Sequence, residues 1–189
     1  MGNPIPYMDG ARPIMATIER YGGFQDSNFI VRQRAWGTYR RPDRFGIRAY
    51  TEFCPHGDLD LAITINGKRA DADEDVQVPE PFIWLVIRNI SEAIYYLQLG
   101  YFFDEKDSPD RPPPRDVPLI HLDIKPGNIF LDTPISPYLL YPNPKLADFD
   151  DHIEANPEAL QTIEFWGTKS WQPPVRSILP HMNDRFLTI

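Results

Sequence analysis

Three polar residues in one short segment could together hold a phosphate group or a metal ion. Asp123, Lys125 and Asn128 bring a carboxylate, an ammonium and a carboxamide into the segment HLDIKPGNIFL, residues 121–131. Polar groups at such close spacing are typical of loops that bind something charged, although the Pro-Gly pair at 126–127 also suits an ordinary solvated turn. The segment therefore predicts either a functional loop or a polar bend.

Two later stretches carry further candidate residues. KLADFDD places Asp148 at the end of an apolar, strand-like run, and GTKSWQPP, residues 167–174, contains Thr168. Taken alone, Asp148 is also typical of a turn at the end of a strand, and Asn128 of a turn former. The order of the stretches along the chain is more informative than any one of them.

The composition is that of a folded domain with long loops. The chain has 189 residues, of which 42% are hydrophobic and 13% aromatic, and it contains 21 prolines. This length can bury a real core. The net charge of −8 argues against a general nucleic-acid partner or an anionic membrane surface, since both require clustered Lys and Arg. A local phosphate site remains compatible with that charge.

The number of cysteines and the hydropathy of the chain further limit the class of protein. Cys54 is the only cysteine, which excludes an intramolecular disulfide and leaves a cysteine-based zinc site without partners. The N-terminus lacks the basic-then-apolar pattern of a signal peptide. The most apolar stretch, 82–103, is interrupted by Arg88, Asn89 and Glu92, so no membrane span is expected. We expect an intracellular protein of the cytoplasm or nucleus.

The first half of the chain predicts a β-hairpin between less regular segments. Residues 29–39 and 45–53 are typical strands around a turn-like RRPDR, after a lead-in that includes a possible helix at 14–21. A short helix is expected near Asp58, and the acidic run at 68–77 is expected to be a solvated loop.

The most clearly marked element is a helix that begins after Pro79 and ends at Gly100. Proline favours the first helical turn and glycine the residue after the last. Its apolar residues recur at helical spacing and should pack on the segment that carries Asp123; they are Phe82, Val86, Ile90, Ile94 and Leu97. Residues 104–118 predict a surface insertion rather than a polyproline ligand, and 119–131 and 144–150 each contain a run of strand length.

In order, these features resemble the protein kinase family of the serine/threonine type. The chain presents EFCPHGDL at 52–59, the long helix, H-x-D-x-K-x-x-N at 121–128, D-F-x at 148–150 and G-T-x-x-W-x-P-P at 167–174. The family's catalytic loop, metal-binding Asp and activation-segment end follow the same order. The resemblance implies an incomplete kinase-like α+β fold, with a partial N-lobe hairpin and the first half of a helical C-lobe.

The resemblance also implies roles for single residues. Asp123 would accept the proton of the substrate hydroxyl, and Lys125 would lie near the transferred phosphate. Thr168 would brace these two side chains. Asn128 and Asp148 would hold Mg²⁺, which favours oxygen ligands. His121 is expected to be a packing and hydrogen-bonding residue of the loop rather than a general base.

The nucleotide would be held by the segment after the second strand. Glu52 and Cys54 resemble the two backbone positions that bond the adenine edge, Thr51 lies beside them, and Asp58 occupies the place of a ribose contact. The implied cofactors are ATP and Mg²⁺, and the implied partner is a protein substrate that the sequence does not identify. The implied regions are a lead-in, partial N-lobe strands and hinge, a partial C-lobe and a tail, at 1–28, 29–53, 54–175 and 176–189.

The chain also departs from the family pattern. It contains no G-x-G-x-x-G and no V-A-I-K-like strand with its phosphate-binding Lys. Leu122 replaces the Arg before the catalytic Asp, Asp150 replaces the Gly of D-F-G, and Val175 replaces the Glu of P-P-E. We therefore expect a truncated or divergent kinase with little or no activity.

Two other functions remain open at this point. The departures could mark a pseudokinase that acts as a binding or scaffold module. A small-molecule phosphotransferase on a related fold would also use an H-x-D…N loop and a following Asp, although Lys125-Pro126 and GTKSWQPP favour protein substrates.

Overall fold

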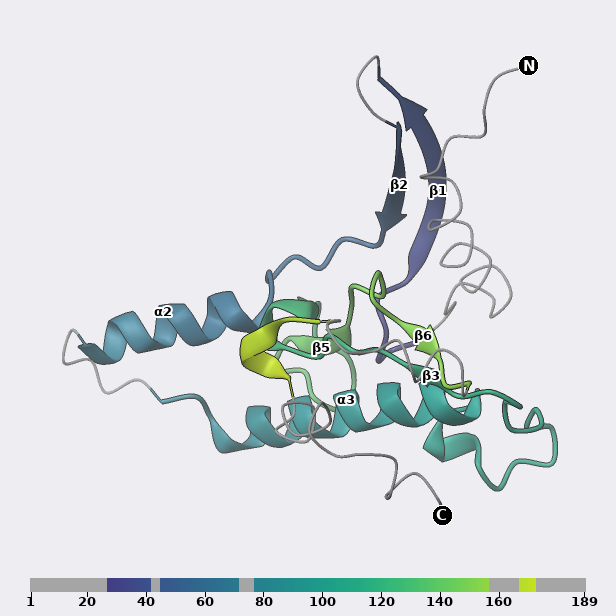
Figure 1. Cartoon of the computed structure of the whole chain (residues 1–189). Helices are drawn as coiled ribbons and strands as arrows, with labels where there is room; N and C mark the ends of the chain where they lie inside the picture. Colours follow the sequence, from purple (N-terminus) through teal and green to yellow (C-terminus); the bar gives the residue numbers. More distant parts are fainter. Residues whose placement is uncertain (1–26, 42–44, 72–76, 157–166, 173–189) are drawn as a thin grey trace, which may run out of the picture.

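The computed structural model describes residues 27–41, 45–71, 77–156 and 167–172 (Figure 1). In this part of the chain two α-helices combine with three two-stranded antiparallel sheets. The predicted mixture of helix and antiparallel strand is thereby confirmed. The possible helix at 14–21, Val175 and the tail at 176–189 lie outside the described residues.

Helix α3, Glu80–Leu99, follows the proline and glycine signals of its sequence. Pro79 is its N-cap residue, and Gly100 ends it in the left-handed conformation at φ 84°. The Gly100 N–H donates to the Tyr96 carbonyl at 2.7 Å, which satisfies one of the carbonyls that a helix end leaves open. The predicted bounds of this helix are confirmed.

The buried face of α3 is rotated slightly from the predicted stripe. Phe82 and Leu97 are buried as expected, but Val86, Ile90 and Ile94 are only half-buried. The remaining buried positions are Leu85, Asn89 and Ala93. A polar residue takes a central place because Asn89 Nδ2 donates to Asn143 Oδ1 at 2.8 Å and to the Pro144 carbonyl at 3.0 Å.

Helix α2, Leu59–Asp71, begins where the sequence predicts but runs further. Asp58 Oδ1 accepts the Leu61 N–H at 2.8 Å, so Asp58 caps the helix. The prediction that the whole of 68–77 is a loop is wrong for residues 68–71, which are helical. Lys68 and Arg69 lie in the last turn, where positive side chains interact favourably with the helix dipole and stabilise the helix.

Two short strand pairs frame the predicted catalytic loop. β4, Ile129–Asp132, pairs antiparallel with β5, Asn143–Leu146. β3, Leu119–Ile120, pairs with β6, Ile153–Glu154. Between them lies the 3₁₀ turn η3, Pro126–Asn128, and two similar turns are η2, Phe103–Glu105, and η4, Lys169–Trp171. The strands predicted in 119–131 and 144–150 are thus confirmed.

The hairpin of β1, Gln33–Arg40, and β2, Phe45–Thr51, projects away from the β3–β6 and β4–β5 strand pairs (Figure 1). Its antiparallel pairing confirms the predicted hairpin. Residues 29–31 were predicted to belong to its first strand, but they run parallel to β5 instead: the Val31 N–H donates to the Leu146 carbonyl, and the Leu146 N–H to the Phe29 carbonyl, both at 2.8 Å. This pairing attaches the hairpin to β5.

The core lies between α3 and the strands. Ala93 and Leu97 pack with Ile30, Leu119 and Leu146, while Phe82 and Leu85 pack against Leu131. The apolar face of α3 therefore supports the strands on both sides of the predicted catalytic loop, as the sequence analysis expected. Within the described residues, neither α2 nor α3 is both long and apolar enough to cross a bilayer.

Candidate active site

Four of the predicted site residues are joined directly by hydrogen bonds. Lys125 Nζ lies 2.7 Å from Asp123 Oδ2 and 2.7 Å from Thr168 Oγ1. Asn128 Nδ2 donates to Asp123 Oδ2 and to the Asp123 carbonyl, both at 2.9 Å. The Thr168 N–H donates to Asp123 Oδ1 at 2.7 Å. We call Asp123, Lys125, Asn128 and Thr168 the Asp123 network.

The network brings together residues that are far apart in the chain. Asp123 and Lys125 lie between β3 and η3, Asn128 ends η3, and Thr168 precedes η4. Asp123 and Asn128 are buried, while the Lys125 side chain keeps 25% of its surface exposed. A simple solvated bend would leave these groups to water, so the arrangement weighs against the alternative of a polar turn.

The bonds of Asp123 control its protonation. Burial by itself raises the pKa of the Asp123 carboxyl, but the hydrogen bonds from Lys125 and Thr168 outweigh it and hold the pKa well below its usual value. Asp123 is consequently a carboxylate throughout the neutral range. It is a strong hydrogen-bond acceptor that orients a donor, and a weak base.

The amide of Asn128 has one defined orientation. Both groups that its Nδ2 faces, the Asp123 carboxylate and carbonyl, are acceptors. The amide oxygen Oδ1 must therefore point away from Asp123. Oδ1 is the atom of Asn128 that could bind a cation.

Backbone packing holds Thr168 against the loop. Gly167 has φ 84°, and a Cβ built on it would lie 2.4 Å from the Leu122 carbonyl oxygen. Glycine alone permits both the positive φ and this close approach. Leu122 itself has φ 67°, so the residue before Asp123 also takes a backbone conformation that is uncommon outside glycine.

His121 bridges the loop and the end of β5. Its Nε2 lies 2.9 Å from the Ala147 carbonyl, and its Nδ1 accepts the Asp123 N–H at 3.3 Å. Its ring lies 4.8 Å from that of Phe149. Burial is the main cause of the lowered pKa of His121, only partly opposed by the bond to Ala147. The neutral, buried ring fits the packing role that the sequence analysis expected.

Asp148 follows immediately after this bridge. The Ala147 N–H donates to the Asn128 carbonyl at 2.9 Å, which places the backbone before Asp148 beside Asn128. Asp148 is exposed and has φ 61°. The positive φ falls on Asp148 and not on Asp150. Burial, then Asp148 and Asp151, raise the pKa of Asp150.

The predicted nucleotide residues lie on a separate segment. The Glu52 N–H donates to the Arg32 carbonyl at 2.9 Å, and the Cys54 carbonyl accepts from the Gly57 N–H at 3.4 Å. Cys54 is buried, whereas Thr51 is exposed. Asp58 caps α2 through Oδ1, a structural role that the sequence analysis missed. None of these residues belongs to the Asp123 network.

Sequence reasoning also missed a buried lysine. Lys145 Nζ lies 2.7 Å from Glu52 Oε1 and 3.0 Å from Asp132 Oδ2. We call Lys145, Glu52 and Asp132 the Lys145 cluster. Its sequence signal is a single Lys inside the apolar run PKLA, since a charge in a buried strand requires a charged partner.

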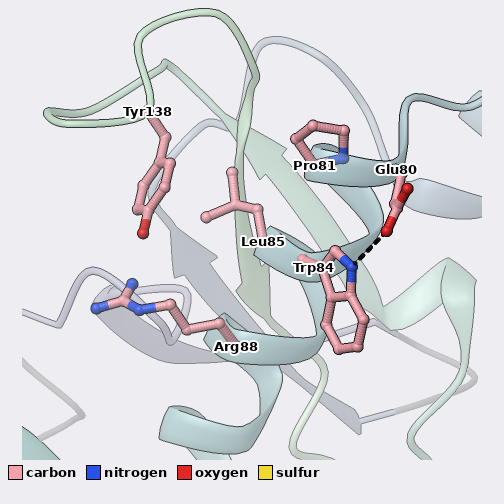
Figure 2. A pocket seen from close by; sticks show the side chains of 6 residues that line it. All are labelled: Glu80, Pro81, Trp84, Leu85, Arg88 and Tyr138. Carbon is pink, nitrogen blue, oxygen red and sulfur yellow. Dashed lines mark hydrogen bonds between the residues drawn. The ribbon is translucent and has the colours of Figure 1, made fainter.

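A cavity at the start of α3 lies apart from these residues (Figure 2). It has a volume of about 680 Å³ and is lined by Glu80, Pro81, Trp84, Leu85, Arg88 and Tyr138. Trp84 Nε1 donates to Glu80 Oε1 at 3.1 Å on one side, and the Arg88 guanidinium lies 5.8 Å from the Tyr138 ring on the other. No predicted site residue lines it.

A scan of the chain against protein-family models finds no match, and a search of curated proteins finds none either. Any functional conclusion must therefore rest on the motifs and on the geometry of the site.

Proposed function

We propose that this chain is a kinase-like domain that binds Mg·ATP and is built to transfer a phosphoryl group to a Ser or Thr hydroxyl of a protein. The observation that carries the proposal is the Asp123 network, which joins three residues of one loop to Thr168 at hydrogen-bond distance. The kinase resemblance selects all four of them, together with Asp148, Glu52, Cys54 and Asp58, which lie outside the network. The proposed fold is correspondingly a partial kinase-like N-lobe hairpin and C-lobe.

In this proposal the substrate hydroxyl would donate to Asp123. A carboxylate of lowered pKa stays ionised and orients the nucleophile, which suits a reaction in which positioning matters more than covalent chemistry. Lys125 would turn from Asp123 towards the transferred phosphate, while Thr168 keeps its backbone bond to Asp123.

Asn128 and Asp148 would hold the magnesium ion. The Asn128 oxygen points away from Asp123, Asp148 is exposed, and both supply the oxygen ligands that Mg²⁺ prefers. Among the described residues no group of three or more His, Cys, Asp or Glu could hold a metal. In the proposed site the remaining ligands would be phosphate oxygens and water. Bound magnesium would neutralise the charge of the phosphates.

The segment Glu52–Cys54 would bind the adenine base, and Asp58 the ribose. Asp58 uses Oδ1 to cap α2, so a ribose contact would fall to Oδ2. The pairing of residues 29–31 with β5 supports this part of the proposal, because it ties the hairpin that leads into the segment to the strand that leads into Asp148.

Phosphoryl transfer by these 189 residues alone should be slow. The sequence has neither the glycine-rich loop nor its partner Lys, and each preorganised donor group is worth about 2.7–4 kcal/mol in the transition state. The loss of two such groups corresponds to a rate lower by roughly four to six powers of ten. A second candidate is a nucleotide-binding module without catalysis, because Leu122, Asp150 and Val175 stand where the resemblance has Arg, Gly and Glu.

Thermal-shift titration of the purified chain with ATP, with and without Mg²⁺, tests the proposal. At about 100 times the Kd, a ligand adds about 2.7 kcal/mol, which should raise Tm by about 5–10 °C for a chain of this size. Asp148→Asn should remove the Mg²⁺-dependent part, and Asp107→Asn, at an exposed loop carboxylate, should keep it.

The same preparation separates the two candidates. Slow transfer of the γ-phosphoryl group to a Ser-containing acceptor peptide, with release of ADP, supports the transferase if Asp123→Asn abolishes it. Stabilisation without transfer supports the binding module. A chain that Mg·ATP leaves unchanged at millimolar concentration contradicts both.

A further inference from the structure

A second charged group, the Lys145 cluster, lies outside the Asp123 network. The side chains of Lys145, Glu52 and Asp132 keep only 8%, 15% and 18% of their surface exposed. They come from the middle of β5, from the segment after β2 and from the end of β4. One ammonium thus joins three parts of the fold.

Apolar side chains could fill the volume that the Lys145 cluster occupies. All four residues of β5 are buried, and replacing a buried ion pair with apolar side chains is often neutral or stabilising. Burial alone lowers the pKa of Lys145, but the bonds to Glu52 and Asp132 outweigh it and raise the pKa. Lys145 is therefore charged. A charged residue stands at a buried position where an apolar one would serve stability as well, which calls for another role.

Glu52 is held from two sides. Its Oε1 accepts from Lys145 Nζ at 2.7 Å and from the Arg32 N–H at 2.9 Å, and its own N–H donates to the Arg32 carbonyl. Two residues later, Cys54 is buried with Val31 and Ala147. The segment Glu52–Cys54 is consequently fixed against the sheet at both ends.

The other end of the link leads to Asp148. Lys145 is paired with Phe130 across the β4–β5 ladder and precedes Asp148 by three residues. The ammonium therefore connects Glu52 to the strand that leads to Asp148.

We propose that Lys145 is a positioning residue that holds Glu52–Cys54 in register with Asp148, so that a purine base and a metal-bound phosphate chain can be bound at the same time. This inference rests on the proposed function. It predicts that loss of Lys145 weakens recognition of the base far more than recognition of the phosphates.

Cys54 provides a readout that needs no nucleotide. Burial, followed by the charges of Asp132 and Glu52, raises the pKa of its thiol to about 11, and Lys145 opposes this rise. If the segment stayed in place, removing Lys145 would raise the pKa further and slow thiol labelling. If the segment is released, Cys54 becomes accessible and labelling accelerates. The raised pKa and the release of the segment would therefore change the labelling rate in opposite directions.

The first experiment measures labelling of Cys54 by an aromatic disulfide reagent in Lys145→Met, with Lys68→Met, at an exposed lysine of α2, as the matched control. We expect labelling at least about tenfold faster in Lys145→Met, the factor that one charge-assisted hydrogen bond is typically worth. Equal or slower labelling overturns the proposal.

Global destabilisation is controlled separately. Wild-type chain is labelled in the urea concentration that lowers its free energy of unfolding to that of Lys145→Met, and the acceleration should exceed this reference. If Lys145→Met does not fold, Lys145→Gln is the milder variant, because its amide can still donate to one of the two carboxylates. It also lacks the ammonium that opposes the raised pKa of Cys54, so the pKa effect and release of the segment would still change labelling in opposite directions. Labelling should be faster than in the wild type, and an unchanged rate counts against the cluster.

The second experiment compares the Kd of Mg·ATP with that of Mg·tripolyphosphate, which lacks the base. Lys145→Met should weaken Mg·ATP by about tenfold and Mg·tripolyphosphate by less than about twofold. An equal loss for both ligands overturns base positioning. A wild-type chain that binds neither ligand overturns the proposed function and the nucleotide role of Lys145, whereas Cys54 labelling still decides whether Lys145 holds the segment.

Discussion

Replacing Asp123 with Asn should destabilise the chain even without a ligand. In the wild type Asp123 Oδ2 faces two donors, Lys125 Nζ and Asn128 Nδ2, and Oδ1 faces a third, the Thr168 N–H. An asparagine has one oxygen and one NH₂ group at the same place. Whichever way it turns, its NH₂ group meets at least one donor.

The cost follows from the better of the two orientations. With its oxygen towards Lys125 and Asn128, the variant side chain keeps both hydrogen bonds in weaker form, at a loss of about 1 kcal/mol each. Its NH₂ group then faces the Thr168 N–H, which is also a donor, and this costs about 1–3 kcal/mol more. Partial exposure of Lys125 reduces the first figure. We expect Asp123→Asn to lower the free energy of unfolding by about 2–4 kcal/mol at pH 7.

Urea denaturation followed by tryptophan fluorescence measures this change, with Asp107→Asn as an exposed control expected to stay within about 0.5 kcal/mol. Amide hydrogen exchange adds a local readout, because the Thr168 N–H should lose protection in the variant. An Asp123→Asn chain as stable as the wild type would refute the reasoning. It would show that the Asp123 network contributes no stability without a ligand.

Two further outcomes follow from buried polar groups. Because the pKa of His121 is lowered below 6.5, the unfolded chain binds a proton that the folded chain does not as the pH falls below 6.5. Stability should therefore fall by up to about 1.4 kcal/mol per pH unit below that value, and His121→Gln should flatten this slope while the exposed His56→Gln keeps it. Asn89→Ala should cost about 2–5 kcal/mol in urea denaturation, because two buried acceptors on β5 lose their donor, whereas Ser91→Ala on the exposed face of α3 should cost less than about 0.5 kcal/mol. A pH slope unchanged in His121→Gln, or equal stability of the two helix variants, would contradict these expectations.

The parts of the fold that follow local rules could be predicted from the sequence. Pro79 and Gly100 mark the ends of α3 because proline and glycine act on the backbone next to them. The hairpin follows from two strand-like runs around a turn. The Asp123 network could be foreseen because three of its members lie within six residues and the motif order supplied Thr168.

The long-range polar pairs could not be predicted in the same way. Nothing near Lys145 in the sequence identifies Glu52, 93 positions away, as its partner. Asn89 interrupts an otherwise apolar face because Asn143 and Pro144 need a donor, and this need exists only once the strand has docked. The length of α2 depends on how far helical packing continues past Asp58, which periodicity alone does not determine.

These same polar pairs explain how so short a strand keeps its register. β5 has four residues, and a slip by one would move Lys145 into an apolar position and Leu146 towards Glu52. Such a slip would leave the buried Lys145 ammonium without its carboxylate partners, at a cost of several kcal/mol. Asn143, bonded to Asn89 and to the Asn28 carbonyl, restrains the other end of the strand. Register in turn determines where the chain emerges at Asp148. The polar contacts of Asn143 and Lys145 therefore specify the position of Asp148, the proposed metal ligand. Apolar packing alone would define that position less well.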